Sequence, residues 1–374
     1  MKTIALLLAA HLCGSHILPE DTTIRLDEVV VSSFYQNTTS KSNVVSAERI
    51  SLANYGQEPS SLFATMPSVI SLNDNGTEFG YGYFRIRGLD QTRINVTLDG
   101  CPWNEAEDFG AYFANSPDLM SSMHAVKVER GSSSLYNGIA GVAGGIMLYK
   151  DSASHVYLGG GSFGSFKSSV VYNMGERNGW GLHVKATHQQ TDGYRDYGFN
   201  TSEALTVKTG YRFNERHSID FLTMNGYHRN GQGWIGNSLE ELESNPSANG
   251  CTKEEDDNWF MSMNRVQYKG WLADHTLLTS SVYFQYQDGS YRFDLDNYMR
   301  RMADSGWETT GALYDYGLKH VMLGANIAAK QYLGDFTLTS GANAYIYRRK
   351  HFMGDGCRNV SPEEYYCNEG KTRS

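Results

Sequence analysis

The chain has 374 residues, of which 40% are apolar, and a formal net charge of -9. This acidic balance argues against a nucleic-acid partner, because a nucleic-acid footprint needs a basic face. Outside the N-terminus no stretch approaches the roughly 18 consecutive apolar residues of a membrane-spanning helix, so no such helix is predicted. The 39 glycines and 25 tyrosines against only 7 prolines favour a β-protein rich in turns.

The N-terminus has the pattern of a secretory signal. A charged start at Met1-Lys2 precedes a short apolar run at 3–10, which is how a signal peptide begins. Small residues allow cleavage after Ser15, whereas lipid attachment at Cys13 is disfavoured because a leucine precedes it. We therefore predict export, with residues 1–15 as the signal peptide.

From about residue 43 the pattern is mixed α/β. Pro59 suits the first turn of a short helix that stops at Pro67, because proline lacks the N–H that the first turn leaves unused. The runs 93–98 and 125–129 alternate between apolar and polar residues as strands do. This part of the chain predicts a compact α/β domain.

From about residue 155 the pattern changes to long runs of alternating apolar and polar residues. In 180–189, for example, one face carries Trp180 and Leu182 while the other carries His183 and Lys185. A period of two is that of strands whose faces meet different environments. Each run reaches the ~9 to 11 residues that a tilted strand needs to cross a membrane. The nine predicted strands begin near residues 156, 166, 179, 203, 217, 259, 275, 319 and 335.

Apart from the first hairpin, Gly161–Ser165, the connections between these strands alternate in length. Outer-membrane barrels have short turns on one side and long loops on the other, and many run ends carry Tyr or Trp, as expected at a membrane interface. A transmembrane β-barrel is therefore favoured over a large secreted β-sandwich, which remains the alternative. The short turns are near 175–178, 214–216, 273–274 and 333–334, and the longer loops are 190–202, 229–258, 288–317 and 350–374.

The segment 126–147 joins a strand to a Ser/Gly-rich turn and a second strand, and it resembles the end of the plug domain of TonB-dependent outer-membrane receptors. It departs from the family at Met147–Tyr149, where Asn usually follows Ile or Val, and at Asn137, which splits the usual Tyr-Gly pair. Five further motifs stand upstream in family order: Asp27–Ser33, Pro59–Val69, Phe84–Gly88, Thr97–Asn104 and Asn115–Leu119.

The resemblance implies four regions along the chain. The expected fold is an α/β plug followed by antiparallel transmembrane β-barrel strands. The regions are a signal peptide at 1–15, a periplasmic lead at 16–42, a plug domain at 43–151 and a partial transmembrane barrel at 152–374.

The acidic-aliphatic stretch within the lead is implied to be the energy-coupling box, which contacts a TonB-type periplasmic transducer. An extended strip of this kind can add as a strand to the edge of a partner's sheet. The three valines alone would favour an ordinary edge strand, but their position between signal and plug favours coupling. The box residues are Asp27, Glu28, Val29, Val30, Val31, Ser32 and Ser33.

The resemblance also implies where the plug meets the barrel and the ligand. Charged contacts with the barrel are expected at Arg85, Arg87, Glu129 and Arg130, because a guanidinium in a confined lumen prefers carboxylate partners. Ordinary surface charge is the alternative. The ligand contacts expected on the plug are Trp103, Asn104, Glu105, Asp108, Phe109 and Tyr112, with the stretch 74–83 and the loop residues Tyr194, Tyr197 and Trp234 as further candidates.

The implied function is energy-coupled import of a scarce ligand across the outer membrane of a Gram-negative bacterium. An iron-siderophore complex is the first choice, with cobalamin, haem or a saccharide as alternatives, and a passive porin or adhesin barrel as the alternative without coupling. Outer-membrane lipid, the transducer and the ligand are the expected partners. No enzyme activity, cofactor or bound metal is expected.

Three other patterns carry weaker expectations. Gly160–Gly164 fits the nucleophile-elbow string, but a strand rather than a helix is predicted to follow, so esterase chemistry is not expected. The acidic run 254–257 is interpreted as a solvated loop rather than a calcium site, because it lacks the spacing of an EF-hand. Cys357 and Cys367 could form a disulfide, whereas Cys101 and Cys251 are expected to be free.

The predicted strand count falls short of the family's barrel. Outer-membrane transporters have about 22 strands around a plugged lumen, against nine predicted here. We therefore expect an incomplete chain that forms a curved, open sheet around the plug, with unpaired edges near residues 156 and 346.

Overall fold

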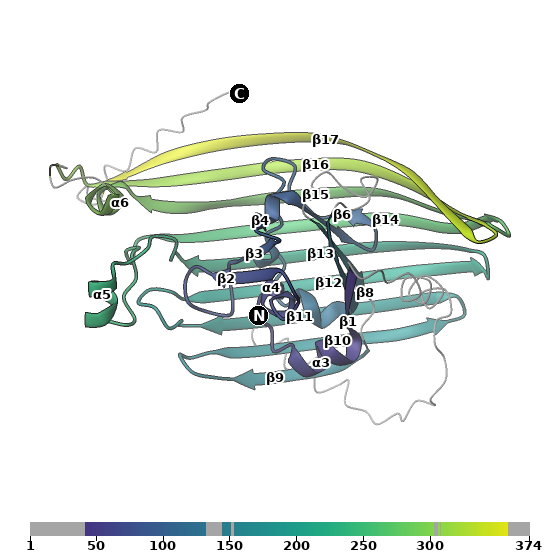
Figure 1. Ribbon diagram of the computed structural model, residues 1–374, viewed down its shortest axis with the longest axis horizontal. Helices are drawn as coiled ribbons and strands as arrows, with labels where there is room; N and C mark the ends of the chain where they lie inside the picture. The colour runs from purple at the N-terminus through teal and green to yellow at the C-terminus, as the bar shows by residue number, and fades with distance from the viewer. Residues whose placement is uncertain (1–41, 132–143, 151–152, 303–305, 307, 358–374) are drawn as a thin grey trace.

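The computed structural model describes residues 42–131, 144–150, 153–302, 306 and 308–357. Its N-terminal part is a small α/β domain, and its C-terminal part is one long sheet (Figure 1). The predicted signal peptide, the box Asp27–Ser33 and Cys367 lie outside the described residues.

The α/β domain, which we call the plug, contains two sheets. Five strands run in the order β1-β7-β8-β5-β6, with β5 and β8 parallel, and three strands run in the order β2-β3-β4. The strands are β1 (Ser42–Ser46), β2 (Val69–Asn73), β3 (Gly82–Ile86), β4 (Leu89–Asp90), β5 (Ile94–Leu98), β6 (Cys101–Pro102), β7 (Met123–Arg130) and β8 (Gly144–Lys150). The helices are α3 (Ala47–Ala53), α4 (Pro59–Phe63) and the 3-10 turns η1 (Gln91–Arg93), η2 (Phe113–Asn115) and η3 (Leu119–Ser122).

Local sequence sets the plug helices. Ser46 caps α3 by accepting a hydrogen bond from the backbone N–H of Arg49. Pro59 occupies the first turn of α4, as predicted, and the Glu58 side chain caps that helix by accepting from the Ser60 N–H.

The interior of the plug is apolar, as in a soluble protein. The rings of Phe63, Phe84 and Phe113 pack with centroids between 5.7 and 6.4 Å apart. Ile86 and Leu148 have no exposed surface at all. This core continues into the long sheet, because Leu222, Met224 and Tyr283 of the sheet belong to the same buried cluster.

The long sheet has nine strands, and each pairs with the next in sequence in the order β9 to β17. Their number and order confirm the prediction. The strands are β9 (His155–Gly160), β10 (Phe166–Arg177), β11 (Trp180–Thr191), β12 (Asn200–Asn214), β13 (His217–Gly231), β14 (Asp256–Ala273), β15 (Thr276–Asp294), β16 (Ala312–Leu333) and β17 (Phe336–Cys357).

The connections confirm the predicted alternation of short turns and long loops. The loop between β13 and β14 contains α5 (Leu239–Ser244), and the loop between β15 and β16 contains α6 (Leu295–Met302). Two predicted loops were drawn too long. In place of the loop 288–317, β15 runs on to Asp294 and β16 begins at Ala312, and in place of a loop from 350, β17 runs on to Cys357, because these residues pair in register with the neighbouring strand. Gly160–Gly164 leads from β9 into β10 rather than into a helix, so the nucleophile-elbow interpretation does not hold.

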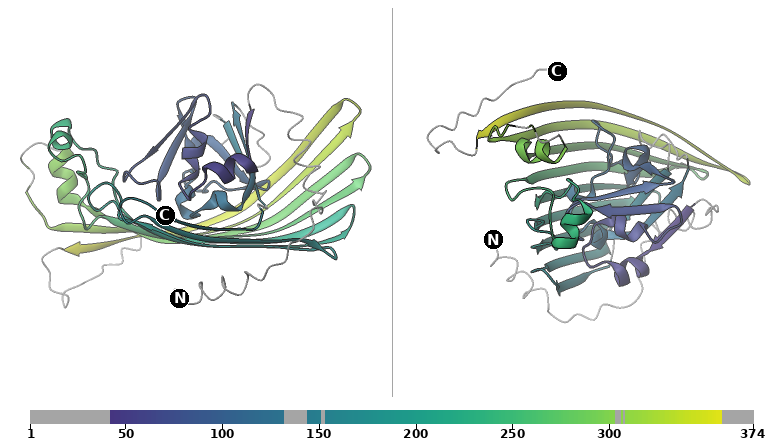
Figure 2. Two further views of the ribbon diagram at one scale, coloured as in Figure 1. Left: turned by 90° about the horizontal axis from the view of Figure 1, so that it is seen from below. Right: turned by 60° about the vertical axis from the view of Figure 1, so that its left-hand side comes forward.

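The sheet is open and curved, and the plug lies on its concave side (Figure 2). Strands β9 and β17 form the two edges among the described residues, as expected. The helices α5 and α6 rise at one end, on the same side as the plug. In the described part of the chain, no helix is both long and apolar enough to cross a membrane.

The two faces of the sheet reverse the usual pattern of burial. On the inward face, Lys167, Lys185 and Arg265 are at most 2% exposed. On the outward face, Leu205 and Leu323 are 47% and 49% exposed. The sheet therefore presents a mostly polar face to the plug and an apolar face to its surroundings. The inward face also carries a buried apolar patch, which includes Met224, Met261, Met263 and Met322.

Candidate functional site

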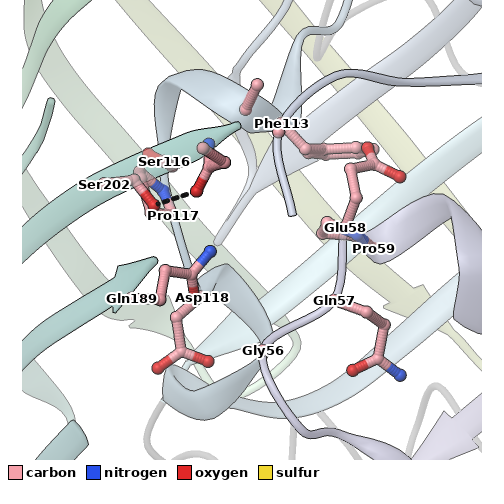
Figure 3. Close-up of a pocket in the computed structure, with 13 residues that line it drawn as sticks. Gly56, Gln57, Glu58, Pro59, Phe113, Ser116, Pro117, Asp118, Gln189 and Ser202 are labelled. Atoms are coloured by element: carbon pink, nitrogen blue, oxygen red, sulfur yellow. Dashed lines mark hydrogen bonds between the residues drawn. The ribbon is translucent and has the colours of Figure 1, made fainter. Parts of the chain in front are cut away.

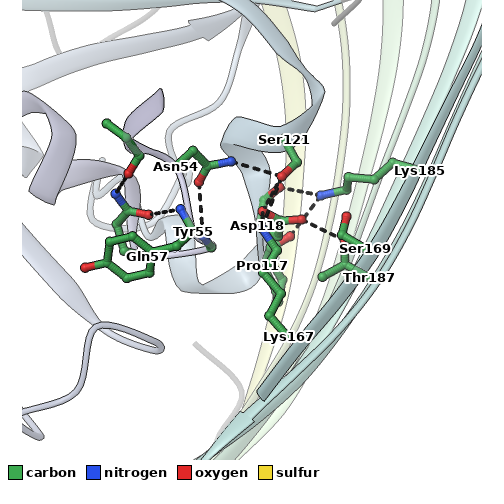
Figure 4. A network of polar contacts seen from close by, with 12 residues as sticks. Asn54, Tyr55, Gln57, Pro117, Asp118, Ser121, Lys167, Ser169, Lys185 and Thr187 are labelled. Carbon is green, nitrogen blue, oxygen red and sulfur yellow. Dashed lines mark hydrogen bonds and ion pairs between the residues drawn. The ribbon is translucent and has the colours of Figure 1, made fainter. Parts of the chain in front are cut away.

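The plug is anchored to β10 and β11 by a buried ion-pair cluster around Asp118 (Figure 4). Lys167 Nζ lies 2.6 Å from Asp118 Oδ1, and Thr187 Oγ1 donates to Asp118 Oδ2 at 2.8 Å. Lys185 Nζ donates to the Asp118 carbonyl oxygen at 2.6 Å. Asp118 has a left-handed backbone (φ 53°), which turns both its carboxylate and its carbonyl toward the inward face of the long sheet. We call this face the barrel wall.

Charge balance keeps this cluster ionised. Burial alone would raise the pKa of Asp118, but Lys185 and Lys167 outweigh burial, so the pKa lies below its ordinary value. Breaking a buried pair by removing one partner typically costs about 3–5 kcal/mol, because the other charge is left uncompensated. We therefore identify the Asp118 cluster as one anchor of the plug.

A narrow polar crevice lies beside this anchor, between the plug and strands β11 and β12 (Figure 3). Glu58 Oε1 and Gln189 Oε1 are buried there without a hydrogen-bond partner among the described residues. Burial raises the pKa of Glu58 to about 7, although Ser60 partly offsets it. Two buried acceptors in a polar space make this a place where water would bind. The crevice is lined by Gly56, Gln57, Glu58, Pro59, Gly80, Phe113, Ala114, Ser116, Pro117, Asp118, Gln189, Asn200 and Ser202.

A second anchor joins the β5–β6 turn of the plug to strands β14 and β16. Arg265 Nη1 is 3.5 Å from Asp99 Oδ2, and the same guanidinium pairs with Asp220. Asn326 Nδ2 donates to the Gly100 carbonyl oxygen at 2.9 Å. Asp99 and Gly100 both have positive φ, 47° and 82°, so a tight turn aims them at the wall.

The third contact region lies on the plug loop that follows β6. Glu107 accepts from Arg349 Nη1 at 2.7 Å and from Tyr347 Oη at 3.1 Å, and it lies 2.8 Å from His351 Nε2. This contact with β17 is less buried than the two anchors, since the Arg349 side chain is 39% exposed.

Glu105 is the buried carboxyl of the same loop. It accepts from Asn115 Nδ2 at 3.2 Å and is hydrogen-bonded to Gln287 of β15. Burial, and then the nearby charge of Asp108, raise its pKa to about 8. Glu105 therefore changes its protonation near neutral pH, where it meets the wall.

The structure places the six predicted ligand residues in two groups. Trp103 and Asn104 are each 2% exposed, and the Asn104 amide donates to the carbonyl oxygens of Ile94 and Phe109 at 2.9 and 2.7 Å. These contacts show that Asn104 holds the shape of the loop. Glu105 is buried, whereas Asp108, Phe109 and Tyr112 are at least partly exposed. Ligand binding by the six residues stays a prediction.

The four predicted plug–barrel contacts lie elsewhere than the anchors. Arg85 and Arg87 are exposed, and Glu129 lies 2.7 Å from Lys127 within the same strand. Arg130 is half-buried at the end of β7. Their role as contacts with a barrel wall stays a prediction.

Sequence reasoning missed the residues that form the two anchors. Lys167, Lys185 and Arg265 stand at inward positions of alternating strands, and a long basic side chain on the polar face was the available signal. Asp99 and Asp118 lie in turns of the plug, and the motifs Thr97–Asn104 and Asn115–Leu119 that contain them were the available signal.

The acidic run 254–257 was interpreted wrongly as a solvated loop. Glu255, Asp256 and Asp257 are at most 5% exposed. Asp256 accepts from Arg229 and from Arg292 at 2.5 Å, which compensates its charge. Asp257 accepts from the Asn230 N–H and Glu255 from the Asp294 N–H, each at 3.2 Å, so contacts with neighbouring strands override the polarity of the run. Cys101 and Cys251 are free, as expected, and the structure buries both.

Comparisons with known proteins agree with this geometry. The family model of the TonB-dependent receptor plug domain matches residues 35–145. No curated protein matches the chain in sequence.

Several solved structures share the fold. The ferric citrate transporter FecA matches with a TM-score of 0.68 and 13% identity over 86% of this chain and 49% of its own. The ferric yersiniabactin uptake receptor FyuA from Yersinia pestis matches with a TM-score of 0.68 and 16% identity, over 87% of this chain and 51% of its own. The copper transporter OprC matches with a TM-score of 0.64 and 17% identity, over 88% of this chain and 49% of its own. The chain thus spans about half the length of these proteins, which are receptors and transporters rather than enzymes.

Proposed function

We propose that this chain, which carries the plug domain and the partial barrel fold of a TonB-dependent receptor, serves energy-coupled import of a scarce ligand across the bacterial outer membrane. The observation that carries the proposal is a plug held by polar contacts against the inward face of a sheet whose outward face is apolar. Outer-membrane lipid covers the outward face after export through the 1–15 signal. A TonB-type periplasmic transducer pulls the plug at Asp27–Ser33.

The chemistry of the anchors supports a plug that is fixed at rest and able to move under force. Charged pairs and hydrogen bonds are directional, and water can replace them as the plug shifts. If the interface were apolar, moving the plug would expose apolar surface to water, at a free-energy cost of about 25 cal/mol per Å². The apolar part of the contact includes flexible methionines, which adapt to small displacements. The inward, buried methionines of the wall are Met224, Met261, Met263 and Met322.

The ligand that we propose first is an iron-siderophore complex. FecA and FyuA, which share the fold, are named for ferric citrate and ferric yersiniabactin, whereas OprC is named for copper. Cobalamin, haem and saccharides therefore remain alternatives. Asp108 is the predicted ligand residue most open to a ligand, because it is exposed, whereas Phe109 and Tyr112 are only partly exposed.

A passive porin or adhesin barrel is the second candidate function. It would need no transducer and no movable plug. Coupled import is favoured because the plug occupies the concave side of the sheet, where a passive pore would run (Figure 2).

Deletion of residues 27–33 separates the two functions. The readout is uptake of radiolabelled ferric siderophore by a strain without its own receptors, with the surface level of each variant measured by immunoblot. Deletion of residues 17–23, which shortens the lead equally and spares the box, is the matched control. We expect the box deletion to abolish uptake and the control to retain it. Uptake that survives the box deletion would contradict coupling and favour a passive barrel.

A further inference from the structure

Four polar side chains lie together on the outward face of the long sheet, within its apolar surface. We call them the polar quartet. They alternate along β13 and β14 with buried inward residues such as Met224 and Met263, so they point away from the plug. All four residues are partly exposed. The members of the quartet are Thr223, Asn225, Ser262 and Asn264.

The antiparallel pairing of β13 and β14 brings the members of the quartet together. Thr223 is the cross-strand partner of Asn264, and Asn225 is the cross-strand partner of Ser262. Each strand thus contributes one hydroxyl and one amide, and each amide stands opposite a hydroxyl. Cross-strand partners have Cβ atoms about 5 Å apart, so the quartet is one continuous patch.

Apolar and aromatic side chains surround the polar quartet on all sides. Asn264 lies halfway along β14 (Asp256–Ala273), so the quartet is at mid-depth of the outward face and not at its rim. Two of the neighbours, Leu205 and Val266, are 47% and 45% exposed. The neighbours along and across the strands are Leu205, Val207, Phe221, Tyr227, Phe260, Val266, Phe284 and Tyr286.

The two amides of the quartet keep most of their hydrogen-bonding capacity. Asn225 Nδ2 donates to Thr223 Oγ1 at 3.1 Å, and Asn264 Nδ2 donates to Ser262 Oγ at 3.0 Å. Among the described residues these are the only side-chain hydrogen bonds of the quartet, so each amide retains its oxygen and one N–H. The hydrocarbon of a membrane offers neither donor nor acceptor, and a polar group left there without a partner is costly. A quartet that faces lipid therefore needs a polar partner.

Neither edge of the sheet can supply that partner. Three strands lie between β13 and the edge strand β9, and two lie between β14 and the edge strand β17. A strand added at either edge would extend the sheet sideways and leave the outward face of β13 and β14 uncovered. The plug lies on the opposite, concave side (Figure 2). The partner therefore has to approach from the lipid side.

The quartet is complementary to a second copy of itself. An amide both donates and accepts hydrogen bonds, and so does a hydroxyl. A two-fold axis along the membrane normal that passes between β13 and β14 exchanges the positions of the two strands in the second copy. Because amides and hydroxyls are cross-strand partners, each amide of one copy then faces a hydroxyl of the other. Two-fold interfaces require this self-complementarity, and the quartet carries no charge that would oppose it.

From these observations we propose that the polar quartet is an interface between two copies of this chain in the membrane. Amides and hydroxyls bond across the two-fold axis, and the surrounding apolar side chains pack around them and exclude lipid. The proposal goes beyond import. It requires that lipid covers the outward face of the sheet, and it does not require that a transducer pulls the plug.

Sedimentation equilibrium of the full chain in density-matched detergent tests the interface. The double variant Asn225→Leu/Asn264→Leu removes both amides and keeps side chains of similar size. Leucine suits a lipid-facing position, so this variant should fold, which circular dichroism checks. We expect the native chain to dimerise, and the double variant to raise the dimer dissociation constant at least about tenfold.

Asn258→Leu is the matched control. Asn258 lies on the same face of β14 as Asn264, beyond Phe260 and therefore outside the quartet. The same change of amide to leucine should leave the dissociation constant unchanged at this position.

Photo-cross-linking in intact membranes identifies the partner. The photoreactive residue p-benzoylphenylalanine replaces Val266, beside the quartet, or Leu182, on the outward face of β11. We expect irradiation to give a product of twice the mass of the chain from position 266 and not from position 182. A product of any other mass from position 266 would show that a different protein covers the quartet and would overturn the proposal.

Three results of the sedimentation experiment would also overturn it: a native chain that stays monomeric, association that the double variant leaves unchanged, or association that Asn258→Leu weakens equally. Association through the open edges β9 and β17 would give the second result. Failure of the interface is distinguishable from failure of coupled import, which the deletion of residues 27–33 tests separately.

Discussion

The plug and the long sheet share period-two strands but bury opposite residues. In β3 of the plug, Phe84 is buried and Arg85 is exposed. In the long sheet, Lys185 of β11 is buried and Leu205 of β12 is exposed. The contrast shows that alternation alone does not decide which face is inside. The plug folds around an apolar core, whereas the sheet turns its apolar face to its surroundings and a mostly polar face, with one patch of methionines that joins the core, to the plug.

The largest expected effect comes from the contact that joins the two regions. Asp118→Ala would leave Lys167 and Lys185 buried without their carboxylate, at a cost of about 3–5 kcal/mol. The measurement is the urea concentration at which half of the plug is unfolded, with unfolding monitored by pulse proteolysis of the protein in detergent.

An exposed ion pair provides the control for Asp118→Ala. Asp274, whose side chain is 92% exposed, pairs with Arg216 at 2.8 Å, and such pairs contribute about 0–1 kcal/mol. We expect Asp274→Ala to leave the midpoint nearly unchanged. Equal effects of the two substitutions would show that Asp118 is not an anchor.

Because the outward face of the sheet is apolar, we expect the cost of a charged substitution there to depend on its depth in the membrane. Leu323→Arg, at the middle of the outward face of β16, should destabilise the sheet in lipid by about 2–4 kcal/mol. Leu333→Arg, at the end of the same strand beside a turn, should cost about 0–1 kcal/mol. Unfolding from lipid vesicles in guanidinium measures both. A soluble sheet would tolerate arginine equally at the two positions.

The plug depends also on backbone turns. Gly131, at the end of β7, has φ 118°, a conformation that valine adopts only with strain. Gly131→Val should destabilise the plug by about 1 kcal/mol or more. Gly236→Val is the control, because a Cβ added there meets no atom within 4 Å. The yield of folded protein and the urea midpoint report the difference, and equal yields would count against the turn.

A further expected effect is a pH dependence of the stability of the plug, linked to Glu105. Its pKa is raised by burial and by Asp108 from 4.5 to about 8, so the folded state holds the proton more tightly than the unfolded state. The stability linked to Glu105 is therefore fully present below about pH 4.5 and is lost as the pH rises through 8. Glu105→Gln should flatten the slope of the urea midpoint between pH 5 and 8, whereas Glu48→Gln on exposed α3 should not. An unchanged slope in Glu105→Gln would refute this role.

Much of the sheet could be predicted from sequence. Its two faces meet different environments, so apolar and polar residues alternate with a period of two along each strand. Leu205 and Thr206 already show the two faces in the sequence, and the nine strands follow from such runs. The extension of β17 to Cys357 could not be predicted, because pairing with β16 rather than local composition keeps that segment extended.

The contacts between plug and sheet could not be predicted in the same way. Asp118 meets Lys167 and Lys185 across 49 and 67 residues of chain. Nothing in the local pattern specifies such a pair, because it depends on how the whole plug sits in the sheet. The exposed positions of Arg85 and Arg87 depend on the same placement.

The most direct test of the reversed sheet is the accessibility of spin labels along β12 in lipid vesicles. Single cysteines replace Leu205, Thr206 and Val207 in turn, and electron paramagnetic resonance measures collisions of each label with oxygen and with a water-soluble nickel complex. We expect oxygen, which concentrates in lipid, to reach the labels at 205 and 207 and not the label at 206. Preferential access of the nickel complex to 205 and 207 would show that the outward face meets water, and would contradict a sheet that turns its apolar side to the membrane.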